Sequence, residues 1–160
     1  MNIMTIASAV CSSFKKELLQ GYHDFDANGS GGDTFKIALY TSGATLNATT
    51  TDYSTNPGGG SNTEVANGNG YTTAGNTLVN TGVGLTSTTA FTDFSDTSWT
   101  SASFTANGCL IYNTQANGGS GTTEAVCVVA FGGDKTVSSG TFTIQFPTND
   151  SSSAILRLTA

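Results

Sequence analysis

The first apolar pattern in the chain has the spacing of an amphipathic helix over residues 5–20. The apolar positions recur every four residues and are Ile6, Val10, Phe14 and Leu18. This spacing places them on one face of an α-helix, and the following Gly21 favours a helix end. We therefore predict an N-terminal helical segment over residues 1–21. Its apolar face either covers the rest of the chain or forms an interface with a partner subunit.

The remaining sequence, residues 22–160, has the patterns of β-strands. Apolar residues alternate with polar ones in 34–41 and again in 141–146, which is the period of a strand with one buried face. Residues 125–131 are apolar throughout, which is typical of a central strand covered on both faces. About eight such short segments, separated by turn signals, predict a single mainly-β domain of β-sandwich or jelly-roll type.

Polar and glycine-rich clusters indicate where the strands end. Residues 74–76 lie between two short β-type segments, 71–73 and 77–79, and this arrangement predicts a hairpin. Two further clusters, at 132–134 and 139–140, predict turns that divide the C-terminal part of the chain into separate short strands.

Composition and charge limit the kinds of molecule that we expect the chain to bind. The chain has 160 residues, of which 10% are charged, and its net charge is −6. The basic residues are Lys15, Lys16, Lys36, Lys135 and Arg157. Because only one Lys-Lys pair is clustered, we expect no nucleic-acid partner and no attraction to an anionic membrane. No apolar run approaches the ~20 residues of a membrane span, and we read the N-terminus as a mature helix rather than a signal peptide.

Few residues could carry chemistry, and the sequence predicts neither a catalytic residue nor a cofactor. Cys11, Cys109 and Cys127 form no disulfide framework or zinc motif. We expect Cys109 and Cys127 to pack as free thiols, as in a chain assembled in a reducing cytoplasm, although a bridge between them is an alternative. His23 is the only histidine and lies near no nucleophile motif, so a solvent-facing or capping role is expected.

Two weaker patterns suggest ligands. Residues 24–30 resemble the first half of a calcium loop, with oxygen ligands at alternate positions and glycine at the sixth. The twelfth position is Phe35 instead of a bidentate Glu, so we predict no tight calcium site. Tyr22, Tyr53 and Tyr71 are candidates for stacking on sugar rings.

Trp99, the only tryptophan, is predicted to anchor the core.

Several longer sequence segments together resemble a family of tailed-bacteriophage virion proteins. They occupy residues 33–42, 70–75, 99–106, 108–113, 131–136 and 140–147. The resemblance implies a non-enzymatic structural protein, a short helix followed by a β-domain, assembled in the host cytoplasm and located in the virion. It implies capsid decoration or cementing, with the major capsid protein or other virion proteins as partners and self-association as a trimer. The alternatives are a tail or fibre component that binds a host-surface glycan and a secreted adhesin.

Overall fold

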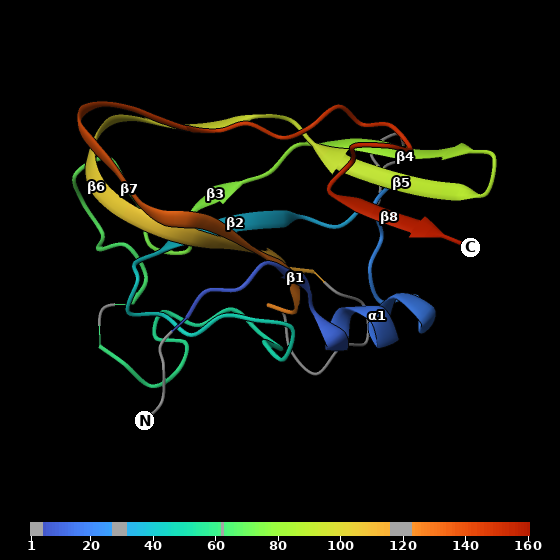
Figure 1. Cartoon of the computed structure of the whole chain (residues 1–160), viewed down its shortest axis with the longest axis horizontal. Coiled ribbons are helices and arrows are strands. Elements are labelled where there is room, and N and C mark those ends of the chain that lie inside the picture. Colours follow the sequence, from blue (N-terminus) through green and yellow to red (C-terminus); the bar gives the residue numbers. More distant parts are fainter. Residues whose placement is uncertain (1–4, 27–31, 62, 116–122) are drawn as a thin grey trace.

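Two antiparallel sheets and one short helix make up the chain, which is mainly β, as predicted (Figure 1). The computed structural model describes residues 5–26, 32–61, 63–115 and 123–160. In the larger sheet the strand order is β1 (Ala9–Val10), β7 (Ala125–Ile144), β6 (Thr97–Asn113), β2 (Phe35–Tyr40) and β3 (Asn76–Thr77). In the smaller sheet it is β4 (Asn80–Thr86), β5 (Thr89–Phe94) and β8 (Leu156–Thr159). The helix α1 spans Ser12–Leu19. This arrangement is consistent with a β-sandwich that carries a short helix.

The core lies around β2 and the adjoining halves of β6 and β7. Residues Phe35, Ile37 and Leu39 of β2 are buried, as their alternation predicts. The start of β7, residues 125–128, is buried on both faces, which confirms a central strand. Trp99 is also buried, at 4% exposure, and contacts the aromatic rings of Phe104 in β6 and Phe142 in β7.

Strands β6 and β7 form one long bent hairpin instead of several short strands. The turns predicted at 132–134 and 139–140 lie inside β7, where the pairing with β6 shifts register and then resumes. Gly108 pairs with Ala130 but Ala106 with Lys135, and Phe104 pairs with Val137 but Ala102 with Gly140. The reason is that Gly132 and Ser139 take left-handed φ angles of 72° and 47°, which bend the strand without ending its pairing. Figure 1 shows both strands curving at one end of the molecule and returning above β2 and β3.

The N-terminal helix is shorter than the spacing predicts. Residues 9–10 form β1, which pairs with Cys127 and Val128 of β7, and Ile6 forms a parallel bridge with Leu46. Backbone pairing with an available strand edge therefore overrides the helical period in the first half of the segment. Only the second half is helical, from Ser12 onward.

The hairpin predicted around residues 74–76 is also wrong, although the turn exists. The Gly75 N–H donates to Thr72 O at 2.9 Å, but residues 71–73 and 77–79 do not pair with each other. Instead, Asn76 and Thr77 form β3 against β2. The short-range turn signal was correct, but the following residues pair with a strand far away in sequence.

Candidate functional site

A large apolar groove lies between α1 and the smaller sheet. Its volume is about 880 Å³, within the range of ligand and docking pockets. Val10, Phe14 and Leu18 line it from the N-terminal segment, and Thr92 and Leu156 line it from the sheet. In Figure 1, β8 is the strand of the smaller sheet drawn nearest to α1.

The pairing of the smaller sheet explains why one of its faces is apolar. Val83 pairs with Thr92, which pairs with Leu156. In the next row on that face, Leu85 pairs with Ala90, which pairs with Leu158. Side chains two residues apart share a face of a strand, so all six residues point the same way. Five of these six line the groove, and Leu85 extends the same face beyond it.

This face and the neighbouring end of α1 expose large apolar side chains. Among the described residues, five large hydrophobic side chains are exposed, and four of them surround the groove. They are Leu19 at 91%, Leu85 at 73%, Val83 at 62% and Leu158 at 61%. A group of exposed large apolar side chains around a groove indicates an interaction site. We name the groove together with these four residues the apolar groove.

The rim of the apolar groove carries charges of both signs. Lys15 and Arg157 line it together with Asp24 and Asp26. The Arg157 guanidinium donates to the backbone oxygen of Ser152. Asp24 Oδ1 accepts the Asp26 N–H at 2.8 Å. The rim is therefore close to neutral, although the whole chain has a net charge of −6.

Three of the four predicted interface residues meet at this site. Phe14 is buried at its floor, whereas Val10 and Leu18 are partly buried along its side. Ile6 lies elsewhere and packs against Gly108 of β6, where an added Cβ would be 2.7 Å from Ile6 Cγ2. Whether these residues contact a partner stays a prediction.

The sequence interpretation missed the sheet side of the groove. Strand β4 was not predicted, because its apolar residues are only Val83 and Leu85, separated by glycine. Their alternation was the available signal. Leu156 and Leu158 belong to β8, and sequence alone could not indicate that this strand faces α1.

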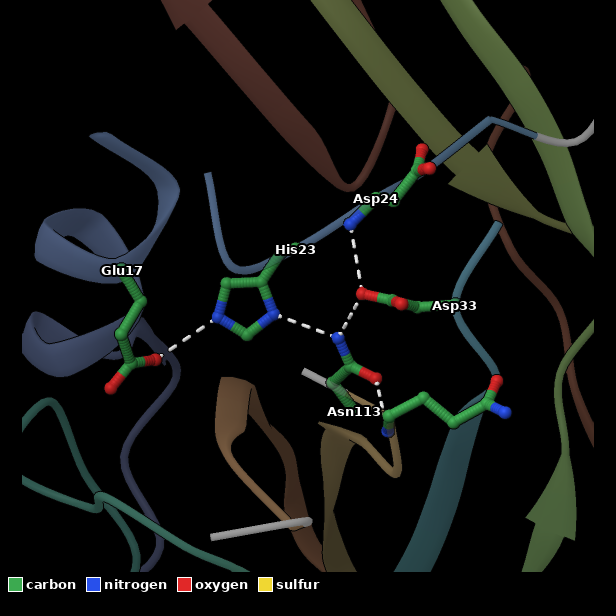
Figure 2. A network of polar contacts seen from close by, with 6 residues as sticks. Glu17, His23, Asp24, Asp33 and Asn113 are labelled. Atoms are coloured by element: carbon green, nitrogen blue, oxygen red, sulfur yellow. Dashed lines mark hydrogen bonds and ion pairs between the residues drawn. The ribbon is translucent and has the colours of Figure 1, made fainter. Parts of the chain in front are cut away.

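His23 supports the floor of the groove through a polar network, shown in Figure 2. Asn113 Oδ1 accepts the Gln115 N–H at 2.8 Å, which fixes the amide so that Nδ2 faces His23 Nδ1 at 3.0 Å and donates to it. His23 Nε2 then carries the proton and donates to Glu17 Oε2 at 3.0 Å. The histidine is buried, so the expectation of a solvent-facing or capping residue is wrong. Its role is to hold α1 against the end of β6.

Asp33, whose carboxylate is a second acceptor in this network, belongs to the calcium-like loop. Asp33 Oδ2 accepts the Asp24 N–H at 2.8 Å and an N–H of Asn113 at 2.6 Å. Residues 27–31 of the calcium-like loop lie outside the described residues. Because Asp33 already binds two protein donors, we still expect no tight calcium site. Among the described residues, no group of three or more His, Cys, Asp or Glu side chains could hold a metal ion.

Two of the three tyrosines proposed for sugar stacking belong to a buried cluster around Glu64. Tyr53 and Tyr71 each donate to the Glu64 carboxylate at 2.7 Å. Tyr71 is 2% exposed, and Tyr53 stacks on Tyr112 with ring centroids 4.6 Å apart. Burial and the nearby Glu64 raise the pKa of both phenols. Tyr71 is therefore a structural residue, whereas Tyr22 and the hydrogen-bonded Tyr53 are each partly exposed.

The cysteines offer no reactive thiolate. All three are free and buried, as expected for Cys109 and Cys127. Burial raises the pKa of Cys11 to about 11 and that of Cys109 to about 12, and it also raises the pKa of Cys127. At neutral pH these thiols are protonated, and the thiolate is the nucleophilic form.

Among the described residues, no helix is long and apolar enough to cross a membrane.

Comparison with known proteins does not assign the chain to a family. No protein-family model matches the sequence, and no significant match was found among curated proteins or among solved structures. The apolar groove is therefore the feature from which a function has to be argued.

Proposed function

We propose that this chain is a non-enzymatic structural protein of a tailed-bacteriophage virion that decorates or cements the capsid exterior. The observation that carries the proposal is the apolar groove, with its exposed Leu19, Val83, Leu85 and Leu158. Such a surface is unfavourable in water and is stabilised when a protein partner covers it. The resemblance in sequence supplies the virion as the setting in which that partner is found.

The composition supports a role in assembly. Only 10% of residues are charged, so burying this surface between protein subunits removes few charges from water. A virion presents many copies of each site, and modest contacts then add through multivalency. A protein that binds only the mature lattice stabilises that lattice by linkage.

The alternative, a tail or fibre protein that binds a host glycan, receives less support. Glycan binding through stacking requires exposed aromatic rings. Tyr71 is buried and Tyr53 is hydrogen-bonded within the Glu64 cluster, so the three candidate rings do not form one open platform.

Particles produced without the chain test the proposal. We expect them to release DNA at a lower temperature, or on removal of divalent ions, while they adsorb to host cells normally. Adding the purified chain back to these particles should restore the heat resistance, which separates decoration from a role during assembly. Failed adsorption with unchanged heat resistance would contradict the capsid role and favour the glycan-binding alternative.

A further inference from the structure

We propose that the polar network around His23 is a pH-sensitive switch, in which protonation of His23 releases the C-terminal end of α1 from β6 and opens the apolar groove. The inference concerns the regulation of the groove on which the proposed function rests, and it needs that function only for its biological setting. The switch itself requires no capsid, so it can be tested on the purified chain.

The side-chain amide of Asn113 is held in one orientation. Its Oδ1 accepts the Gln115 N–H at 2.8 Å, and its Nδ2 donates to the Asp33 carboxylate at 2.6 Å (Figure 2). A backbone N–H can only donate and an ionised carboxylate can only accept, so reversing the amide would break both hydrogen bonds. Nδ2 therefore also faces His23 Nδ1 as a donor, at 3.0 Å. This contact requires Nδ1 to carry no proton.

Protonation of His23 turns this contact into a repulsive one. Both ring nitrogens of an imidazolium are donors, so two N–H groups would then face each other between His23 and Asn113. The His23 side chain is fully buried, at 0% exposure, so water does not replace the lost acceptor. A buried donor without an acceptor is unfavourable, and the contact between His23 and β6 is therefore lost.

The same proton strengthens the contacts of His23 with α1. Its Nε2 lies 3.0 Å from Glu17 Oε2, and this hydrogen bond becomes an ion pair when the ring is charged. The ring also contacts Phe14 of α1, with ring centroids 4.9 Å apart. His23 thus remains attached to α1 when it is protonated, and the connection that breaks is the one to Asn113 in β6.

The other charged groups near His23 already have protein partners or lie farther along the groove. Asp33 Oδ2 accepts N–H groups of Asp24 and Asn113, and Asp24 Oδ1 accepts the Asp26 N–H. Three further charged residues line the groove together with His23, namely Lys15, Asp26 and Arg157. Glu17, the carboxylate that contacts His23 directly, lies on α1, so it holds the charged ring on the helix side.

The hydrogen bonds at the two ends of α1 indicate which end moves. The N–H groups of Cys11 and Ser12 donate to Val126 and Ala48, at 2.9 and 2.8 Å, and these bonds do not depend on His23. At the other end, the N–H groups of residues 20–22 donate to oxygens of α1 itself. The imidazole therefore connects this end to β6. The last turn of α1 contributes lining residues to the groove, so its displacement widens the groove.

Nuclear magnetic resonance on the purified chain provides the first test. His23 is the only histidine, so imidazole nitrogen signals report on it alone, and we expect the Nε2–H tautomer at pH 8. As the pH falls from about 8 to about 5, the range in which histidines titrate, the Asn113 side-chain amide signal should shift together with the ring. Over the same range, the hydrogen-exchange protection of residues 18–22, corrected for the intrinsic effect of pH, should fall by about tenfold, as expected for one lost hydrogen bond.

Two results of this titration would overturn the switch. One is protonation of His23 with unchanged protection of residues 18–22. The other is an imidazole that stays neutral until the whole chain unfolds. Unchanged Trp99 fluorescence across the pH range shows that the fold is retained.

Variants separate the switch from a general effect of acid. His23→Gln carries no titratable group at this position, so the protection of residues 18–22 should be the same at both ends of the pH range. Glu17→Gln keeps an acceptor but removes the charge that favours the imidazolium, so the transition should move to lower pH. Asp134→Asn, at an exposed position in β7, is the matched control and should leave it unchanged. An equal shift in both carboxylate variants would contradict the mechanism.

Binding of the neutral apolar dye Nile red tests the effect on the groove. The wild type should bind it about tenfold more tightly at pH 5 than at pH 8, because apparent affinity follows the population of the open state. His23→Gln should show no such difference. Equal binding by the wild type at both pH values would refute the opening of the groove and leave the capsid role standing, because the particle tests are made at neutral pH. If the dye responds as expected but particles lacking the chain keep their heat resistance, the switch stands and the capsid role is wrong.

Discussion

Glu64 organises the polar interior of the protein. Its carboxylate accepts hydrogen bonds from Tyr53, Tyr71 and the backbone N–H of Ala74, each at 2.7 Å. Tyr71 also accepts the Leu39 N–H at 3.0 Å, which connects this cluster to β2. A buried carboxylate is stable when hydrogen bonds satisfy it, so the cluster holds the loops around residues 53, 64 and 71 against the core.

The buried phenols predict the response of the protein to alkaline pH. Burial, followed by the neighbouring Glu64, raises the pKa of Tyr40 and Tyr112 as well as that of Tyr71, and the pKa of Tyr53 is also raised. Their contribution to stability is therefore fully present below the unfolded pKa, about 10, and is lost as the pH rises through the folded values. We expect tyrosinate absorbance from these four residues to appear only together with loss of the circular dichroism signal. Smooth titration near pH 10 in a folded chain would show that the phenols are accessible.

A second prediction at the residue scale concerns Trp99. Its ring contacts Tyr71, Phe104 and Phe142, with centroids 6.1 to 6.5 Å apart, and Nε1 has no hydrogen-bond acceptor among the described residues. Trp99→Ala should lower the free energy of unfolding by about 3–5 kcal/mol. Trp99→Phe should cost clearly less, because it keeps most of the packing and removes the unsatisfied donor. Urea unfolding followed by circular dichroism measures both, and equal losses would argue against this packing role.

At the scale of elements, close packing between a turn and a strand positions β3. Gly75 lies directly against β2, and an added Cβ would be 1.8 Å from the Ile37 backbone oxygen. The neighbouring Ala74 and Gly75 both have positive φ angles, of 73° and 68°. The absence of a side chain at Gly75 is thus required by the pairing of β3 with β2.

Gly132 provides a matched comparison for this element. It has a similar φ of 72° but no atom within 4 Å of an added Cβ. Gly132→Ala should cost only the left-handed strain, about 1–2 kcal/mol. Gly75→Ala should cost about 1–3 kcal/mol more, because β2 or the turn must move. The two unfolding free energies decide the matter, and equal values would mean that the turn adapts freely.

The elements also show how far local patterns determine the structure. The alternation in β2, the apolar run that begins β7 and the burial of Trp99 were predictable, because each depends on which residues avoid water. The length of β6 and β7 was not, since Gly132 and Ser139 bend a paired strand where sequence indicates turns. The first half of the predicted helix was wrong for a related reason. Ala9 and Val10 pair with β7, and the spacing of apolar residues along the chain does not reveal such a contact. The apolar groove was predictable only in part. Its helix side was predicted from the apolar spacing, whereas its sheet side depends on the register of three strands.

For the whole molecule, self-association should couple to thermal stability. If the native chain self-associates and the unfolded chain is a monomer, the melting temperature rises with chain concentration. For a chain of about this size, each kcal/mol gained shifts the melting temperature by about 2–4 °C. We expect this rise for the wild type. A wild-type melting temperature that is independent of concentration would contradict self-association.

The pairing of β1 with β7 has a consequence for the order in which the protein folds. Ala9 and Val10 pair with Val128 and Cys127, which lie far along the chain, so this contact closes a very long loop. Topologies dominated by such contacts fold in milliseconds to seconds, and a ribosome adds only about 5–20 residues per second. The first strand therefore emerges several seconds before its partner. During translation the N-terminal apolar residues remain uncovered by β7, and completion of the larger sheet has to wait until β7 has been synthesised.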